Sequence, residues 1–326
     1  MNSFSEKILK ELIKASDQRL IVPFYHLVTD SENTFANHLY TPRKVVDFKK
    51  DLEMLTLHYT PLLLKEFIAL SKSEKKVSKN YFHLTFDDGL SNFYNVVAPI
   101  LLERKIPATV FVNTDFVDNK ALFYRYKASL LYQNYSASSP KEKRKFYNFF
   151  NEEGTVKSKL FDINYNNKGV LDDVAKAVDY DFEAFLAQKQ PYLSTIQIQE
   201  LIDMGFTIGA HSKNHPLYAD IEFEEQIIQT EESIEWLVKT FNLDYKAFSF
   251  PHTDLEVSKK FFVTLAEEKK IDISFGTSGI KKDDFKTNFQ RLFFEIGNQS
   301  AEKHLIIEYI KHFLKIPFFK NTMPRN

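Results

Sequence analysis

The chain has 326 residues, a length typical of one large domain or two smaller ones. Its hydrophobic and charged fractions, 44% and 27%, are those of an ordinary globular protein, and a net charge of −1 gives no sign of the concentrated basic surface that a nucleic-acid partner requires. The absence of cysteine excludes disulfides, thiolate metal ligands and a cysteine nucleophile, so any metal must be held by His, Asp or Glu.

The sequence contains no segment typical of secretion or of a membrane span. Residues 1–20 alternate charged and apolar side chains and lack the continuous apolar core of a secretory signal. No stretch approaches the roughly 20 apolar residues of a membrane span, so we expect a cytoplasmic protein. The aromatic and basic residues 313–320 have two interpretations: packing on the domain, which we expect, or contact with a membrane surface.

The first third of the chain predicts a helix, a strand and two further helices. Residues 3–14 have the spacing of an amphipathic helix, and the short apolar run at 20–25 predicts a strand that ends at His26. Residues 42–59 and 62–70 again carry apolar side chains at helical spacing, which predicts two helices in succession.

A strand–loop–helix–strand unit follows, and then the pattern changes. Apolar runs at 81–86 and 108–112 predict two strands, with a helix between them that Ser91 could cap. Such a unit implies parallel pairing of its strands. From 118 to 192 the alternation stops and the periodic stretches look helical. We therefore predict a helical insertion, serving as a lid or a partner surface, within a single catalytic domain of residues 1–326.

Strands and helices alternate again from residue 206 onward. With the three earlier strands the count is about seven, which predicts the α/β class and a distorted, seven-stranded (β/α) TIM-like barrel. In such barrels the reactive groups follow the strand ends. The later strands are predicted at 206–210, 245–250, 271–275 and 291–296, and the helices from about 222, at 258–269 and at 301–313.

Two adjacent carboxylates, Asp87 and Asp88, follow the second predicted strand. Burying two charges side by side is costly unless a cation or hydrogen-bond donors compensate. Consecutive strand residues point to opposite faces, so the loop must turn for both carboxylates to serve one site, and Gly89 permits such a turn. The alternative is a solvated Asp-Asp-Gly turn.

Two histidines, His211 and His215, follow a later predicted strand at a spacing that lets both face one point. Neutral imidazoles are common ligands of zinc and similar ions, although both residues could also be ordinary surface histidines. Two imidazoles and one carboxylate make a three-ligand hydrolytic metal site with open positions. Because both motifs directly follow predicted parallel strands, we expect them at the same end of the barrel.

In this order, Thr-Phe-Asp-Asp-Gly at 85–89 and His-Ser-Lys-Asn-His at 211–215 resemble the first two signature motifs of the polysaccharide deacetylase (NodB-like) family. Tyr-His at 25–26 and Phe-Ser-Phe-Pro-His at 248–252 also resemble its pattern, and the similarity extends over about residues 21–296 outside the insertion. The resemblance implies a metal-dependent hydrolase that removes an acetyl group from an N-acetylated sugar in a glycan or glycan precursor.

The resemblance also implies roles for individual residues. Asp88, His211 and His215 would hold a divalent metal, which we expect to be zinc. Asp87 would be the general base that takes a proton from metal-bound water as this water attacks the acetyl carbonyl. The metal and a backbone N–H would stabilise the oxyanion, and the candidate donor is the N–H of His252.

The sequence departs from the family pattern at two places. Ser249 stands where the family often has an arginine that pairs with the base. The late apolar run that leads to a catalytic histidine is not visible after Arg291. The general acid is therefore open, and we rank the candidates as His252 first, then His26, then His304.

Three residues are candidates for substrate binding: His26, Pro251 and Arg291. Arg291 fits the pattern of an inward-facing strand arginine, which either binds substrate or packs against an aspartate. The alternative function is a catalytically weak or inactive relative that binds a saccharide or a partner through the same cleft, although the retained Asp87 argues against it. A third possibility is a metal hydrolase acting on another amide or ester.

Overall fold

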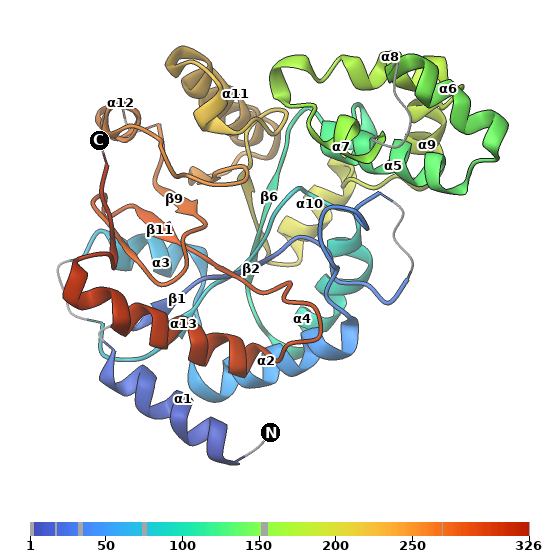
Figure 1. The fold of residues 1–326 in the computed structure, drawn as a ribbon. Helices are drawn as coiled ribbons and strands as arrows, with labels where there is room; N and C mark the ends of the chain where they lie inside the picture. The colour runs from blue at the N-terminus through green and yellow to red at the C-terminus, as the bar shows by residue number, and fades with distance from the viewer. Residues whose placement is uncertain are drawn as a thin grey trace.

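The computed structural model describes residues 3–16, 18–31, 35–73, 77–150, 156–268 and 270–325. A nearly closed sheet of eight parallel strands lies at its centre, in the order β11-β9-β8-β7-β6-β5-β2-β12, with helices around it (Figure 1). The predicted α/β barrel is confirmed, with one strand more than the seven expected. The strands are β2 (Pro23–Tyr25), β5 (Leu84–Phe86), β6 (Ala108–Val112), β7 (Thr207–Ala210), β8 (Ala247–Ser249), β9 (Ile273–Gly276), β11 (Asn288–Gln290) and β12 (Leu292–Phe293).

Most of the barrel strands are continuous apolar runs, because a parallel sheet is covered on both faces. All five residues of β6 are buried, for example. The strand that sequence patterns do not reveal is β11, where buried Asn288 and Gln290 flank Phe289. Their amide groups donate to the carboxylate of Asp254, so a polar network stands where an apolar pattern would be expected.

Helices between the strands cover the outside of the barrel, and α1 packs on α13 (Figure 1). A π-helical turn, η1 (Phe93–Val97), leads into α4. Two small sheets stand apart, β1 (Leu20–Ile21) with β4 (Tyr81–Phe82) and β3 (Thr60–Pro61), and β10 (Lys282–Asp283) with β13 (Thr322–Met323). The helices are α1 (Ser3–Ala15), α2 (Val45–His58), α3 (Leu64–Ser71), α4 (Ala98–Arg104), α10 (Thr195–Asp203), α11 (Phe223–Phe241), α12 (Lys259–Glu267) and α13 (Ala301–Lys315).

The predicted insertion forms a group of helices to one side of the barrel (Figure 1). These helices have a hydrophobic core of their own, which also includes Leu27 and Leu90 from the barrel loops. Residues 151–155 of the predicted insertion lie outside the described part of the chain. Its status as an insertion within a single domain stays a prediction. The helices are α5 (Tyr124–Ala137), α6 (Pro140–Phe150), α7 (Val156–Phe161), α8 (Val170–Ala177) and α9 (Phe182–Lys189).

The aromatic and basic segment near the end of the chain is more exposed than expected. Phe318 and Phe319, in and after the short helix η5 (Ile316–Phe318), are 70% and 88% exposed. The expectation that this segment packs on the domain is wrong for these two side chains, whereas Phe313 is partly buried against the main core. Among the helices that the structure describes, none is long and apolar enough to cross a membrane.

Candidate active site

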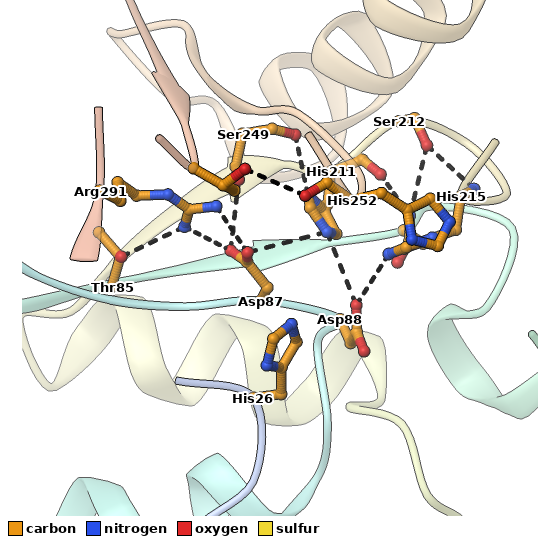
Figure 2. A network of polar contacts seen from close by, with 12 residues as sticks. His26, Thr85, Asp87, Asp88, His211, Ser212, His215, Ser249, His252 and Arg291 are labelled. Carbon is orange, nitrogen blue, oxygen red and sulfur yellow. Dashed lines mark hydrogen bonds and ion pairs between the residues drawn. The ribbon is translucent and has the colours of Figure 1, made fainter. Parts of the chain in front are cut away.

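The carboxyl ends of the barrel strands bring both aspartates and four of the candidate histidines together (Figure 2). His26 follows β2, Asp87 and Asp88 follow β5, His211 follows β7, and His252 lies three residues after β8. Parallel strands end at one edge of a sheet, so residues far apart in the sequence meet there.

A sharp turn after β5 separates the two aspartates. Asp88 and Gly89 both have left-handed backbone conformations, with φ of 69° and 62°. A side chain at Gly89 would lie 2.9 Å from the Val112 side chain, so this position needs glycine for both its conformation and the space. The turn directs the Asp87 carboxylate to Arg291 and the Asp88 carboxylate to His215.

Asp87 is held by a two-pronged ion pair with Arg291. The two guanidinium nitrogens donate to the two carboxylate oxygens at 2.7 and 2.6 Å, and both residues are buried. The Ser249 hydroxyl donates to Asp87 Oδ1 at 3.3 Å. Burial raises the pKa of Asp87, but the charge and the hydrogen bonds of Arg291 outweigh burial and hold this pKa below its ordinary value.

Arg291 supplies the guanidinium that Ser249 cannot. It lies between β11 and β12, is fully buried, and also donates to the carbonyl oxygen of Gly276. Of the two roles expected from the sequence, this geometry favours a partner for an aspartate over a residue that binds substrate. The pairing of Arg291 with Asp87 could not be predicted from the sequence, because 204 positions separate the two residues.

Asp88, His211 and His215 offer three buried donor atoms that lie within 4.8 Å of one another. His215 Nε2 is 3.2 Å and His211 Nε2 is 3.6 Å from Asp88 Oδ1. Ligand atoms about 2.0–2.1 Å from a tetrahedral zinc ion would lie about 3.3 Å apart, so these spacings fit.

The hydrogen bonds around these three residues also fit a metal. His211 Nδ1 lies 2.8 Å from the Ser249 carbonyl oxygen and donates a hydrogen bond to it. The other ring nitrogen, Nε2, then carries a lone pair, which faces Asp88. Asp88 Oδ1 has no hydrogen-bond partner within the described ranges, although it is buried. Burial lowers the pKa of His211 to about 4, so its imidazole is neutral, as a ligand must be.

His26 forms an ion pair with a buried carboxylate that the sequence did not single out. Its Nδ1 is 2.6 Å from Glu295 Oε2, while Glu295 Oε1 accepts the backbone N–H of Leu27. Burial alone would lower the pKa of His26, but the charge and hydrogen bond of Glu295 raise it to about 9. His26 therefore carries a proton at neutral pH and is 20% exposed.

The other candidates for the general acid lie in less suitable places. His252 packs against His215, with ring centres 4.5 Å apart, and burial above all holds the pKa of His252 well below its ordinary value. A neutral histidine is a poor proton donor. His304 is on α13 and lines a neighbouring cavity with Glu308. Pro251 is buried beside His252.

The side chains of the two aspartates line a cavity of about 430 Å³, a size suited to a sugar unit. A larger cavity of about 560 Å³, between α1 and β11, contains none of the candidate residues, so the chemistry belongs to the smaller one. The insertion contributes two side chains to its lining, Phe123 and Arg125. The lining residues are Phe24, His26, Leu39, Tyr40, Asp87, Asp88, Phe123, Arg125, His211, His215, Phe250, His252, Thr277 and Phe293.

Solved structures of deacetylases share this fold. The deacetylase PplD from Streptococcus pyogenes, solved with acetate, is 16% identical, with a TM-score of 0.58 over 89% of this chain and 97% of that one. IcaB from Ammonifex degensii is 13% identical, with a TM-score of 0.56 over 90% and 97%. A de-N-acetylase from Aggregatibacter actinomycetemcomitans is 14% identical, with a TM-score of 0.53 over 88% and 99%.

At such low identity, the structural likeness shows the fold alone. No curated protein sequence matches the chain significantly. A family model described as polysaccharide deacetylase matches residues 74–268, which is more than half of the chain and includes Asp87 and the three candidate metal ligands Asp88, His211 and His215. On this match, the chain belongs to the polysaccharide deacetylase family.

Proposed function

We propose that the protein is a divalent-metal-dependent hydrolase that removes the acetyl group from an N-acetylated sugar in a glycan or glycan precursor. The observation that carries the proposal is the ion pair of Asp87 and Arg291, which holds an ionised carboxylate beside the three candidate ligands. A protein that only binds saccharide has little need of such a base. A cytoplasmic location stays a prediction.

Asp88, His211 and His215 would hold the metal, and two nitrogens with one oxygen favour zinc. When bound there, a divalent ion would lower the pKa of a coordinated water and polarise the acetyl oxygen. Burial of the three side chains keeps bulk water from competing for their donor atoms.

Asp87 would act as the general base. Its carboxylate is ionised because Arg291 pairs with it, and the same pair fixes its orientation. Asp87 would accept a proton from the attacking water as the water oxygen bonds to the acetyl carbon. His252 follows β8 at the cavity, where its backbone N–H stays a candidate donor to the oxyanion.

His26 would act as the general acid. It takes the place of His252, which we ranked first from the sequence. It lines the cavity, and its contact with Glu295 keeps it protonated. Its proton would pass to the sugar nitrogen as the carbon–nitrogen bond breaks, which releases acetate and a free amino sugar. His26 would then take up a proton from solvent, and the carboxylate of Glu295 would stabilise the charged ring that results.

The alternative of an inactive relative that only binds saccharide was motivated by the missing arginine at position 249 and the missing late histidine. Arg291 and His26 are positioned to fill these two roles. We therefore retain one proposed function.

Two matched variants test it. Asp88→Ala should lose bound metal and activity together, whereas Asp87→Asn should keep the metal and lose at least about 100-fold in kcat. Metal content is measured by elemental analysis after zinc loading and desalting, and activity by free amine released from N-acetylglucosamine oligomers. A wild-type protein that retains no metal would refute the proposal.

A further inference from the structure

We propose that Tyr126, in helix α5 of the insertion, is a positioning residue for Asp88, which determines the carboxylate oxygen that faces the metal. This inference rests on the proposed metal-dependent function. The Tyr126 hydroxyl donates to Asp88 Oδ2 at 2.6 Å, and the tyrosine side chain is fully buried. A charge-assisted bond this short and this buried is among the stronger contacts available to a carboxylate.

The two oxygens of Asp88 have different surroundings. Oδ2 accepts the Tyr126 proton, while Oδ1 faces His215 Nε2 at 3.2 Å and His211 Nε2 at 3.6 Å. The hydrogen bond holds Oδ2 on the side of Tyr126 and leaves Oδ1 directed at the two imidazoles, where a metal would bind. Tyr126 therefore favours a carboxylate that binds through a single oxygen and leaves open positions for water and substrate.

Each tyrosine hydroxyl has a single proton, which decides the donor in the two hydrogen bonds that link Tyr40, Tyr126 and Asp88. An ionised carboxylate only accepts, so the single hydroxyl proton of Tyr126 must go to Asp88. The Tyr40 hydroxyl lies 3.0 Å from that of Tyr126, and it must then donate to the Tyr126 oxygen. The chain Tyr40→Tyr126→Asp88 polarises Tyr126 and strengthens its bond to the carboxylate. The Tyr40 ring also stacks on His26, with ring centres 5.0 Å apart.

Aromatic packing fixes Tyr126 in place. Its ring contacts Phe35 and Phe123, with centres 4.8 and 5.1 Å apart. Phe123 in turn packs on His215 at 4.3 Å, and its backbone N–H donates to the Tyr192 hydroxyl. The start of α5 thus supports two of the three candidate ligands, and the insertion is part of the metal centre.

The test is the zinc affinity of Tyr126→Phe, measured by competition between the metal-free protein and a chromophoric chelator. Loss of a partner that orients a ligand typically weakens metal binding by about 10–100-fold, and we expect that range. The matched control is Tyr135→Phe in the same helix, because the Tyr135 hydroxyl bonds to that of Tyr147 instead. The control should stay within about twofold of wild type.

Two further measurements separate positioning from folding. Melting of the metal-free proteins should be similar for Tyr126→Phe and Tyr135→Phe, and the visible spectrum of Co²⁺-loaded Tyr126→Phe should change because Asp88 can then bind through both oxygens. If Tyr126→Phe does not fold, Tyr40→Phe decides, with an expected weakening of about 2–5-fold. Unchanged affinity in that variant would overturn the inference.

The outcome also distinguishes this inference from the proposed function. Wild type that binds zinc, together with a folded Tyr126→Phe that binds it within twofold of wild type, would overturn the inference alone. Wild type that binds no metal would overturn the proposed function and the inference with it.

Discussion

At the scale of single residues, the site combines side chains from two short motifs with partners from distant parts of the chain, such as Arg291 and Glu295. Asp87, Asp88, His211 and His215 each follow a strand, so spacing alone brought them to one place. Partners that meet only in three dimensions could not be assigned. Glu295, for example, lies 269 positions from His26 along the chain and is what keeps that histidine protonated.

The assignment of the general acid predicts opposite results for two histidines. His26→Gln should lower kcat by about 100-fold or more, because it removes the proton donor to the leaving nitrogen. His252→Gln should lower kcat less than tenfold, since that ring is uncharged at neutral pH. Steady-state amine release at pH 7 measures both. The reverse order of effects would show that the acid is His252.

The pairing of Asp87 with Arg291 predicts a large cost for breaking it. Arg291→Met should lower the free energy of unfolding by about 3–5 kcal/mol, because it leaves a buried carboxylate without its partner. The double variant with Asp87→Asn should recover part of that loss, since the uncompensated charge is gone. Urea denaturation measures the free energy of unfolding of wild type, of Arg291→Met and of the double variant. A loss below about 1 kcal/mol for Arg291→Met would contradict a strong buried pair.

At the scale of elements, the apolar strands were predictable and the polar one was not. Strands β5, β6 and β7 are short apolar runs, whereas β11 carries two buried amides that bond to acidic side chains. In the insertion, aromatic residues are spread along the sequence, so the pattern indicates helices but neither their number nor Tyr126 at the metal site. Tertiary contacts decide both.

The same acidic side chains bind Arg325 near the end of the chain. Its guanidinium contacts the buried carboxylates of Asp254 and Asp283, next to the pairing of β13 with β10. Arg325→Met should lower the free energy of unfolding by about 3–5 kcal/mol, since two buried charges lose one partner. Lys320→Met, at an exposed position, is the control and should change it by less than about 0.5 kcal/mol. Equal stability of the two variants in urea would contradict this role.

At the scale of the whole molecule, the strand–helix alternation and the motif positions predicted the barrel and the end that carries the site.

A histidine inside the barrel makes the stability of the protein depend on pH. His83 is fully buried, with Nδ1 2.8 Å from the Leu62 carbonyl oxygen and Nε2 2.8 Å from the Thr109 hydroxyl. Burial lowers its pKa to about 4, from 6.5 in the unfolded chain.

The sign of this dependence follows from proton binding. Between pH 6.5 and 4 the unfolded chain binds the proton and the folded protein does not. The stability from neutral His83 is therefore complete above pH 6.5 and is lost as the pH falls toward 4. The loss approaches about 3 kcal/mol. In urea titrations of metal-free protein between pH 6.5 and 4, the free energy of unfolding of His83→Gln should fall by about 3 kcal/mol less than that of wild type. Parallel curves would contradict the prediction.

The central claim is that this site removes acetyl groups with a metal. The most direct measurement is acetate release from N-acetylglucosamine oligomers and nucleotide-linked N-acetyl sugars by zinc-loaded protein. We predict equal amounts of acetate and free amine, loss of both on chelation, and recovery when zinc is restored. A protein that binds zinc at Asp88, His211 and His215 yet releases no acetate from any of these substrates would contradict the account.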